Sequence, residues 1–276
     1  MFRSLKITRP SFHMPRNAID RKALYLLHQE SNEDSILRAA NRCQNFFTIS
    51  TKNKPNESSS AVRVRLARSQ DVRQIMKFVR ENFVHEEPLM KSLNIASTRS
   101  TLPLETIIAT HLKNGFTMIA VEGQKNVVGL ALNLRNCYWD GSVLQNAAEK
   151  AETEPLKKLF YIWSIVSSEP KLHERFMTPC IFELAMLATA RDFQRRGIGY
   201  QLTMESLRLA RDLGYQVARM DCTSEYSSRL ADRVGLECIW SVPYNHLVDG
   251  SRKPVAKPEH PHTHIRVHAA KLENFN

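Results

Sequence analysis

Beyond residue 60, the polar and apolar positions follow two periods in turn, one typical of strands and one typical of helices. Residues 62–66 alternate with period two, as expected of a strand with one buried face. Apolar residues at helical spacing over 72–83 then predict an amphipathic helix, and Ser69 is its expected N-cap. Two β-rich runs, 116–121 and 127–134, are joined by a short turn that contains a glycine, which predicts a hairpin.

The second half of the chain continues this alternation. The segment 156–166 is apolar enough for a helix that packs on a sheet. Strands are expected at 180–190, 216–222, 237–242 and 264–270, and helices at 197–213 and 226–234. Because strands alternate with helices and also pair through hairpins, the pattern predicts the α/β class, with a mixed (α+β) sheet in a single domain.

The first 60 residues differ from the rest in composition. Residues 53–60 are polar and rich in serine, which is typical of a linker. Residues 1–60 carry 10 Lys/Arg against 5 Asp/Glu, so they hold +5 of the net charge of +11. We therefore expect a basic N-terminal extension over 1–60, disordered or targeting, and a folded domain over 61–276. Residues 1–19 have the composition of a mitochondrial transit peptide, with a disordered basic arm as the alternative.

Bulk composition excludes several classes of protein. Hydrophobic residues are 42% and charged residues 24% of the 276, which fits a globular chain with its own core. No run reaches the roughly 18 apolar residues that span a bilayer. The five cysteines are scattered without a CxxC pair, so we expect reduced and mostly buried thiols rather than disulfides. Four histidines between positions 260 and 268 lack accompanying cysteines or carboxylates, and no metal is expected.

The segment Gln194-Arg195-Arg196-Gly197-Ile198-Gly199 follows a predicted strand and begins a predicted helix. The first N–H groups of a helix have no intrahelical partner, and together with the helix dipole they favour phosphate. Gly197 and Gly199 permit close backbone approach, while Arg195 and Arg196 supply positive charge. The spacing is neither GxGxxG nor GxxxxGK(S/T), so the dinucleotide and P-loop sites lack their required residues. The alternative to a phosphate site is that this glycine-containing segment only forms the turn between the strand and the helix.

Together with this loop, three further segments resemble a known family. Residues 194–199 match Q/R-x-x-G-x-G/A, the pyrophosphate loop of the GCN5-related N-acetyltransferases (GNAT superfamily). Residues 83–89, 221–229 and 234–237 are similar to segments of the insect-type arylalkylamine (dopamine) N-acetyltransferases. Those segments are aromatic-x-x-acidic-Glu-Pro-Leu, Cys-Ser-Ser-x-Tyr-Ser and Leu-Gly-Phe. The likeness runs from Val62 to near Leu272 and implies the GNAT acyltransferase fold.

The resemblance implies transfer of an acetyl group from acetyl-CoA to a primary amine. An ammonium group is not nucleophilic, so a base must first remove a proton. Residue chemistry alone leaves His85, Glu86 and Glu87 open as that base. Glu87 could also be a solvent-exposed carboxylate at a helix end with no catalytic role. The match to Glu-Pro-Leu selects Glu87 as the general base, acting through water.

The resemblance also implies which residues handle acetyl-CoA. It implies a splayed strand at Leu187, where the backbone N–H would polarise the thioester carbonyl and the strand would pair with the pantetheine arm. The implied acetyl-CoA contacts are Leu187, Thr189, Gln194, Arg195, Arg196, Gly197, Ile198, Gly199 and Tyr226.

Proton transfer to the leaving thiolate would fall to nearby hydroxyl groups. Ser227 corresponds to the family serine proposed for proton transfer, and Thr223 stands where another serine is usual, so both join Glu87 as candidate catalytic residues. Many superfamily members protonate the thiolate with a tyrosine, but this chain has Ala231 at that position. Tyr226, Ser227 or a water would have to replace it, and ring packing beside CoA is the structural alternative for Tyr226.

The implied amine is an arylalkylamine such as serotonin, dopamine, tryptamine or octopamine, with a polyamine or a protein N-terminus or lysine as the alternative. Phe160, Tyr161 and Trp163 could line an aromatic pocket, although apolar residues at helical spacing are more often core. An insertion between Asn136 and Pro155 is expected to cover the site rather than leave a peptide groove.

The expected partners are therefore acetyl-CoA and a small-molecule amine, without nucleic acid or a membrane. A cytoplasmic protein is expected, with mitochondrial import as the alternative, and a monomer is favoured. A non-enzymatic role would instead have the basic extension bind nucleic acid or membrane. That segment lacks the interleaved aromatic and basic residues typical of nucleic-acid binding.

Overall fold

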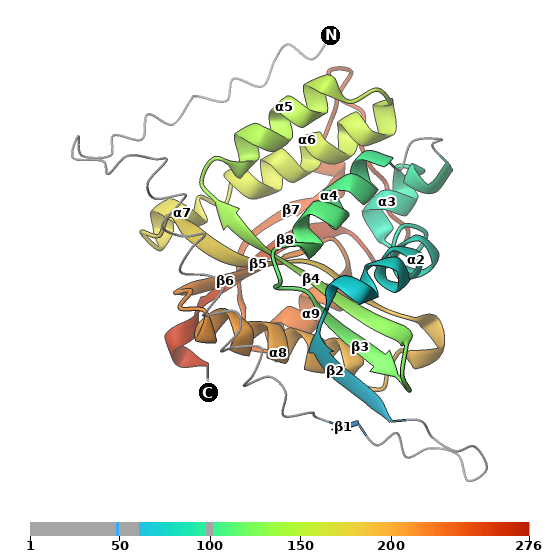
Figure 1. Ribbon diagram of the computed structural model, residues 1–276. Helices are drawn as coiled ribbons and strands as arrows, with labels where there is room; N and C mark the ends of the chain where they lie inside the picture. Colours follow the sequence, from blue (N-terminus) through green and yellow to red (C-terminus); the bar gives the residue numbers. More distant parts are fainter. Residues whose placement is uncertain (1–47, 50–60, 98–101, 276) are drawn as a thin grey trace.

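One mixed β-sheet forms the centre of the structure (Figure 1). The computed structural model describes residues 48–49, 61–97 and 102–275, and within them the sheet has eight strands in the order β1-β2-β3-β4-β5-β6-β8-β7. Among these strand pairs β5 and β6 are parallel, while the others are antiparallel. The strands are β1 (Thr48–Ile49), β2 (Val62–Leu66), β3 (Met118–Glu122), β4 (Asn126–Cys137), β5 (Cys180–Thr189), β6 (Val217–Cys222), β7 (Glu237–Pro243) and β8 (His264–Lys271).

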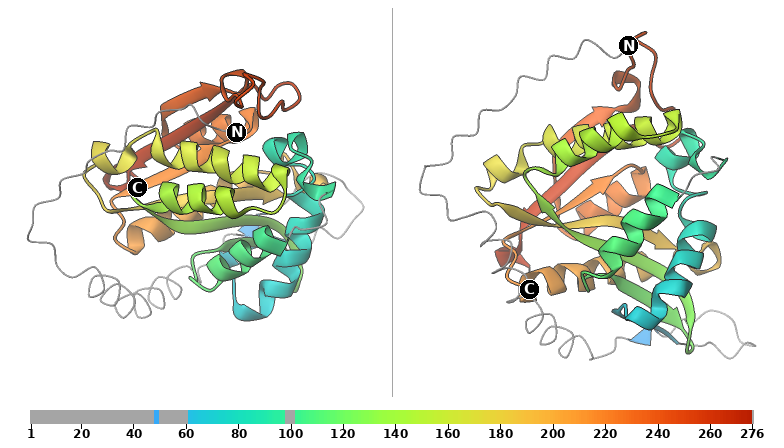
Figure 2. Two further views of the ribbon diagram at one scale, coloured as in Figure 1. Left: turned by 90° about the horizontal axis from the view of Figure 1, so that it is seen from above. Right: turned by 45° about the horizontal axis from the view of Figure 1, so that its top comes forward.

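Helices cover both faces of this sheet (Figures 1 and 2). On one face α8 packs on β2 to β5 and α9 on β6 to β8. On the other face α2 and α4 pack on β4, and α5 lies along α6. The helices are α2 (Val72–Asn82), α3 (Pro88–Ser92), α4 (Leu102–Leu112), α5 (Asp140–Lys150), α6 (Glu154–Ser168), α7 (Leu172–Arg175), α8 (Ile198–Asp212) and α9 (Glu225–Arg233). Single 3₁₀ turns lie at Ser69–Asp71, Ile95–Ser97, Arg191–Phe193, Tyr244–His246 and Leu272–Asn274.

The central strands read as continuous apolar runs because helices bury both of their faces. Seven consecutive residues of β4, from Val127 to Asn133, are buried. Leu159 and Ile162 of α6 pack on one side of the sheet, and Leu202 of α8 packs on the other. Each fully buried aliphatic side chain of this kind contributes about 1.5–3 kcal/mol to stability. The mixed α/β sheet predicted from the pattern is confirmed, and the helices and strands that were predicted lie within a few residues of their expected positions. Helices α3, α4, α5 and α7 and the short strand β1 were not predicted.

One local prediction about a helix start is wrong. Ser69 is not the N-cap of α2 but the first residue of a 3₁₀ turn. Asp71 directly precedes α2, and its carboxylate accepts the Arg68 N–H at 2.7 Å and pairs with Arg65 at 2.6 Å. The Arg65–Asp71 ion pair joins the end of β2 to the start of α2. The Ser69 hydroxyl makes no such link.

Most of the predicted N-terminal extension lies outside the described residues. Its one described part is β1, in which Thr48 and Ile49 pair with Arg63 and Val62 of β2. The remainder of 1–60, including the predicted targeting segment and linker, therefore stays a prediction. Among the helices that are described, none has the length and apolar character to cross a membrane.

Strands β5 and β6 separate in the middle of the sheet. Their parallel pairing ends at Leu184 and Met220. Beyond that point β5 continues to Thr189 along β4, and β6 continues to Cys222 along β8. One edge of β5 is therefore left open between two strands, and a cavity lies at this opening.

Candidate active site

A cavity of about 1050 Å³ lies where β5 and β6 diverge. It is walled by β4, β5, α3, α5, α6 and the start of α9. Of the residues predicted for the site, those that line it are Glu87, Leu187, Thr189, Gln194, Thr223, Tyr226 and Ser227. These residues come from three separate segments of the sequence, at position 87, at 187–194 and at 223–227, so the fold brings them together.

The open edge of β5 carries unused backbone groups that face the cavity. The N–H of Ala190 donates to Val128 O of β4 at 2.9 Å. Because neighbouring residues of a strand point their backbone groups to opposite sides, Leu187 and Thr189 direct theirs away from β4. The carbonyl of Thr189 accepts a hydrogen bond from Gln194 Nε2 at 3.3 Å, which agrees with this direction.

The start of α8 lies beside this open edge. Gly197 is its N-cap with φ of 79°, and the first helical hydrogen bond runs from the Gln201 N–H to Gly197 O at 3.0 Å. The N–H groups of the three residues between them thus have no intrahelical partner and are available to an anion. A Cβ added at Gly199 would lie 3.9 Å from Thr189 Oγ1, so the helix start and the strand edge are in contact.

The two arginines before α8 are exposed and lie outside the cavity wall. Arg195 adopts a left-handed backbone conformation with φ of 60°, and the Arg196 guanidinium donates to Asp192 O at 2.6 Å and lies over the Phe193 ring. Both charges therefore stand at the same end of α8 as its unpaired N–H groups, where the helix dipole is positive.

Glu87 is the N-cap of α3 and is half-buried in the cavity wall. Its two carboxylate oxygens accept the N–H groups of Leu89 at 3.1 Å and Met90 at 2.6 Å. Burial raises the pKa of Glu87, and a hydrogen bond with the Thr223 side chain and the two backbone bonds offset this rise only in part. Loss of solvent thus makes Glu87 a stronger base than a solvated glutamate.

The structure separates the three residues that sequence reasoning left open as the base. His85 is exposed and is not part of the cavity wall. Glu86 lines the cavity but is also exposed, whereas Glu87 points its carboxylate at the turn that begins α3. Glu87 is therefore the one of the three that is both desolvated and fixed in place.

The hydroxyl groups at the start of α9 are held by the helix cap. Ser227 Oγ donates to Ser224 O at 3.0 Å and lies 2.8 Å from Ser224 Oγ, which in turn accepts the Ser227 N–H. Tyr244 Oη donates to Thr223 O at 2.8 Å and fixes the segment before the helix. Tyr226 is 64% exposed, and its ring meets that of His262 edge to face at 5.3 Å.

Helices α5 and α6 close the far side of the cavity. Phe160 and Trp163 line it, with ring centroids 5.8 Å apart, whereas Tyr161 does not line it. Val143 and Leu144 of α5 also line it, so part of the insertion predicted to cover the site does form its wall.

A buried ionic network underlies the same wall. Arg219 is completely buried and donates to both carboxylate oxygens of Asp221 at 2.7 and 2.8 Å, and to Val166 O at 3.1 Å. Asn136 joins this group to Glu183, donating to its Oε2 at 2.8 Å and accepting from Arg219 at 3.3 Å. Burial, with Asp221 nearby, raises the pKa of Glu183 to about 7 even though Arg219 opposes the rise.

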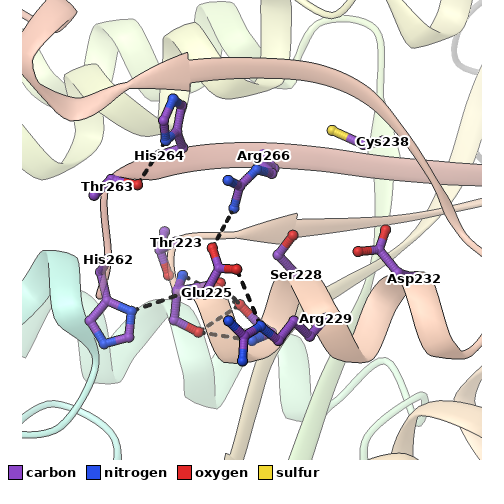
Figure 3. Close-up of polar contacts among 12 residues, drawn as sticks. Thr223, Glu225, Ser228, Arg229, Asp232, Cys238, His262, Thr263, His264 and Arg266 are labelled. Carbon is purple, nitrogen blue, oxygen red and sulfur yellow. Dashed lines mark hydrogen bonds and ion pairs between the residues drawn. The ribbon is translucent and has the colours of Figure 1, made fainter. Parts of the chain in front are cut away.

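Sequence reasoning missed the segment before β8, which closes the cavity between α3 and α9. Glu259 pairs with Lys91 at 2.8 Å, and the Lys257 N–H donates to Ser92 Oγ at 2.6 Å. Figure 3 shows His262 beside Glu225, whose N–H donates to His262 Nδ1 at 3.1 Å. These contacts join residues far apart in the chain, and the polar sequence of the segment contains no signal for them.

The histidines near the C-terminus have separate partners. His264 contacts Thr263 at 2.8 Å, as Figure 3 shows. His268 contacts Asp232 at 3.1 Å. His262 precedes the strand rather than alternating along it. Within the described residues, no three His, Cys, Asp or Glu side chains are grouped as a metal site would require.

Solved structures similar to this chain include several N-acetyltransferases, although no family model matches it. An agmatine N-acetyltransferase is 21% identical with a TM-score of 0.71, and arylalkylamine N-acetyltransferase 2 from Aedes aegypti is 23% identical with a TM-score of 0.71. A polyamine N-acetyltransferase from Drosophila melanogaster, which forms N-acetylagmatine, is 22% identical with a TM-score of 0.70. Each match covers 76% of this chain and 99% of the other. The chain therefore has the fold of the GCN5-related N-acetyltransferases, in the form that these arylalkylamine and polyamine enzymes share.

Proposed function

We propose that this protein is an N-acetyltransferase that moves the acetyl group of acetyl-CoA to the primary amine of a small molecule. The observation that carries the proposal is the meeting of a desolvated carboxylate, an open strand edge and a helix N-terminus at one cavity. The fold shared with N-acetyltransferases supports it.

Acetyl-CoA would lie along the open edge of β5. The backbone groups of Leu187 and Thr189 that point away from β4 suit the amide groups of the pantetheine arm, which can pair with them as an added strand once Gln194 releases the Thr189 carbonyl. The pyrophosphate would meet the N–H groups that begin α8, and Arg195 and Arg196 would add positive charge from the same end. This direction places the thioester in the cavity and the nucleotide outside it.

Glu87 would take the proton from the ammonium form of the substrate, directly or through one water. The free amine then attacks the thioester carbonyl carbon, and the Leu187 N–H stabilises the oxyanion. Collapse of the intermediate breaks the C–S bond. The attacking nitrogen gives up a proton, and the thiolate takes one up through Ser227, Tyr226 or water, which leaves the neutral amide and the CoA thiol. Thr223 would hold the Glu87 carboxylate in position.

An arylalkylamine is the substrate class that the far wall supports best. Phe160 and Trp163 present aromatic surface to the cavity, and aromatic pairs of this kind contribute about 0.5–1.5 kcal/mol beyond buried area. The test is CoA thiol release by purified protein against a panel of arylalkylamines, polyamines and peptides. Absence of turnover with every amine would refute the proposal, and turnover of peptides alone would assign the substrate to proteins.

A polyamine is the second candidate, because the cavity also has acidic side chains. Glu183 and Asp140 line it, and burial raises the pKa of each. A second cation on the substrate would favour their ionised forms. We expect Glu183→Gln to raise KM for a polyamine more than for tryptamine if polyamines are the substrate. An equal change for both amines would show that Glu183 only supports the wall.

A further inference from the structure

Two thiols that the sequence separates by 43 positions face each other in the sheet. Cys137 ends β4, Cys180 begins β5, and the register places them directly opposite. Their Sγ atoms are 3.4 Å apart, and both are free thiols. This pairing was not expected from the scattered cysteines of the sequence, and Cys238 is exposed rather than buried.

The backbone places the two cysteines at a site that suits a cross-strand disulfide. The Cys137 N–H donates to Asp140 Oδ2 at 2.8 Å, and Cys180 O accepts from Thr178 Oγ1 at 3.0 Å. The two residues thus form a non-hydrogen-bonded pair, in which antiparallel Cα atoms lie about 4.5 Å apart. That spacing falls inside the range of about 4.4–6.8 Å seen across disulfides.

The two thiols also differ in a way that suits exchange chemistry. Cys180 is only half-buried, whereas Cys137 is buried. The hydrogen bond from Cys137 lowers the pKa of Cys180 to about 7, with the Arg135 charge assisting and burial opposing. The same hydrogen bond, together with burial, raises the pKa of Cys137. Cys180 is therefore the attacking thiolate and Cys137 the resolving thiol.

We propose that Cys137 and Cys180 are a reversible dithiol–disulfide pair that exchanges with small-molecule disulfides such as oxidised glutathione. The Cys180 thiolate attacks one sulfur of the oxidant and forms a mixed disulfide, releasing one small thiolate. Cys137 then loses its proton and attacks Cys180 Sγ, which forms the protein disulfide and releases the second small thiol. The protein loses two electrons, and the oxidant is reduced to two thiols.

The disulfide would act on the amine end of the proposed active site. The two sulfur atoms must approach from 3.4 Å to about 2.05 Å, which ties the end of β4 to the start of β5. Asn136 and Asp140 flank Cys137 and line the cavity. Resting on the proposed function, we expect oxidation to change KM for the amine at least threefold while the Kd of acetyl-CoA stays unchanged.

The experiment equilibrates the full chain in buffers of increasing oxidised-to-reduced glutathione ratio, then blocks free thiols and maps peptides by mass spectrometry. The expected result is a linked pair of peptides containing Cys137 and Cys180 that disappears on reduction. Cys137→Ser should stop at a glutathione adduct on Cys180, and Cys180→Ser should show neither product. Cys238→Ser is the matched control, because it removes an exposed thiol and should leave the linked pair intact.

The inference is overturned if wild-type protein keeps both thiols free in fully oxidised glutathione, or if the linked pair forms only after denaturation. It is equally overturned if oxidation joins Cys180 to another cysteine. Because peptide mapping needs no amine and no acetyl-CoA, this result is independent of the acetyltransferase proposal. Failure of the amine panel would refute that proposal alone.

Discussion

The substitution Glu87→Gln tests the proposed general base with little change in shape. Glutamine keeps one side-chain oxygen, so it can still accept one of the two N–H groups that Glu87 accepts at the start of α3. The other N–H faces the amide nitrogen, and a lost cap contact of this kind costs about 1 kcal/mol. The variant should therefore fold, with a fall in Tm of only a few degrees.

The effect on catalysis should be much larger. General base catalysis contributes about 100- to 10,000-fold, which corresponds to about 3–5 kcal/mol of transition-state stabilisation. Glutamine cannot take a proton, so kcat should fall within this range. Acetyl-CoA should bind with unchanged Kd, because the strand edge at Leu187 and the start of α8 are untouched.

The pH dependence gives a second signature. Glu87 acts when deprotonated, so kcat/KM of the wild type should rise with pH through the pKa of this group. Burial raises that pKa above the usual 4.5, so the rise should lie at higher pH than for a solvated glutamate. In Glu87→Gln this rise of kcat/KM at low pH should vanish. A separate rise that is due to deprotonation of the substrate amine should remain.

The measurement is CoA thiol release with tryptamine and with a polyamine between pH 5 and 9, beside an acetyl-CoA titration. Glu86→Gln and His85→Ala are the matched controls, because both neighbours are exposed and should retain activity within about threefold. The assignment of Glu87 as the base would be refuted if either control lost as much activity as Glu87→Gln. It would also be refuted if Glu87→Gln kept its kcat and the rise of kcat/KM at low pH.

Two further predictions concern the start of α8 and the buried ionic network. Gly197→Ala should cost about 1–2 kcal/mol in a thermal melt and weaken acetyl-CoA binding in a titration, because φ of 79° strains an L-residue. Gly199→Ala, whose Cβ would lie 3.6 Å from Leu230, is the control for stability and should leave the melt unchanged. Arg219→Met should cost about 3–5 kcal/mol in urea unfolding, because it leaves Asp221 buried without its partner. A double variant that also replaces Asp221 with Asn should recover part of this loss, and no recovery would argue against the ionic account.

Much of the fold follows from short-range pattern. Residues 62–66 alternate with period two, and β2 occupies those residues because one of its faces is buried. The helix α8 begins one residue after the predicted start because Gly197 takes the left-handed N-cap position. The pattern fails at the N-cap of α2, where Asp71 rather than Ser69 precedes the helix and its carboxylate binds Arg65.

In the candidate site, too, some features follow from local sequence motifs and others depend on tertiary contacts. Residue chemistry alone left His85, Glu86 and Glu87 open, and the resemblance to a family segment selected Glu87, so its role and that of the loop 194–199 stay predictions. The segment that closes the cavity was not predictable, since the ion pair of Lys91 with Glu259 joins positions 168 apart. The face-to-face position of Cys137 and Cys180 likewise depends on strand register.

By itself, the sequence determined the fold class and the approximate positions of the strands and of helices α2, α6, α8 and α9, because hydrophobic periodicity and backbone requirements act within a few residues. Tertiary structure decided which side chains meet. It separated β5 from β6 to open a cavity at Leu187, and it removed Glu87 from water so that its pKa rises. Distances and desolvation depend on contacts across the whole chain, and a linear pattern does not contain them.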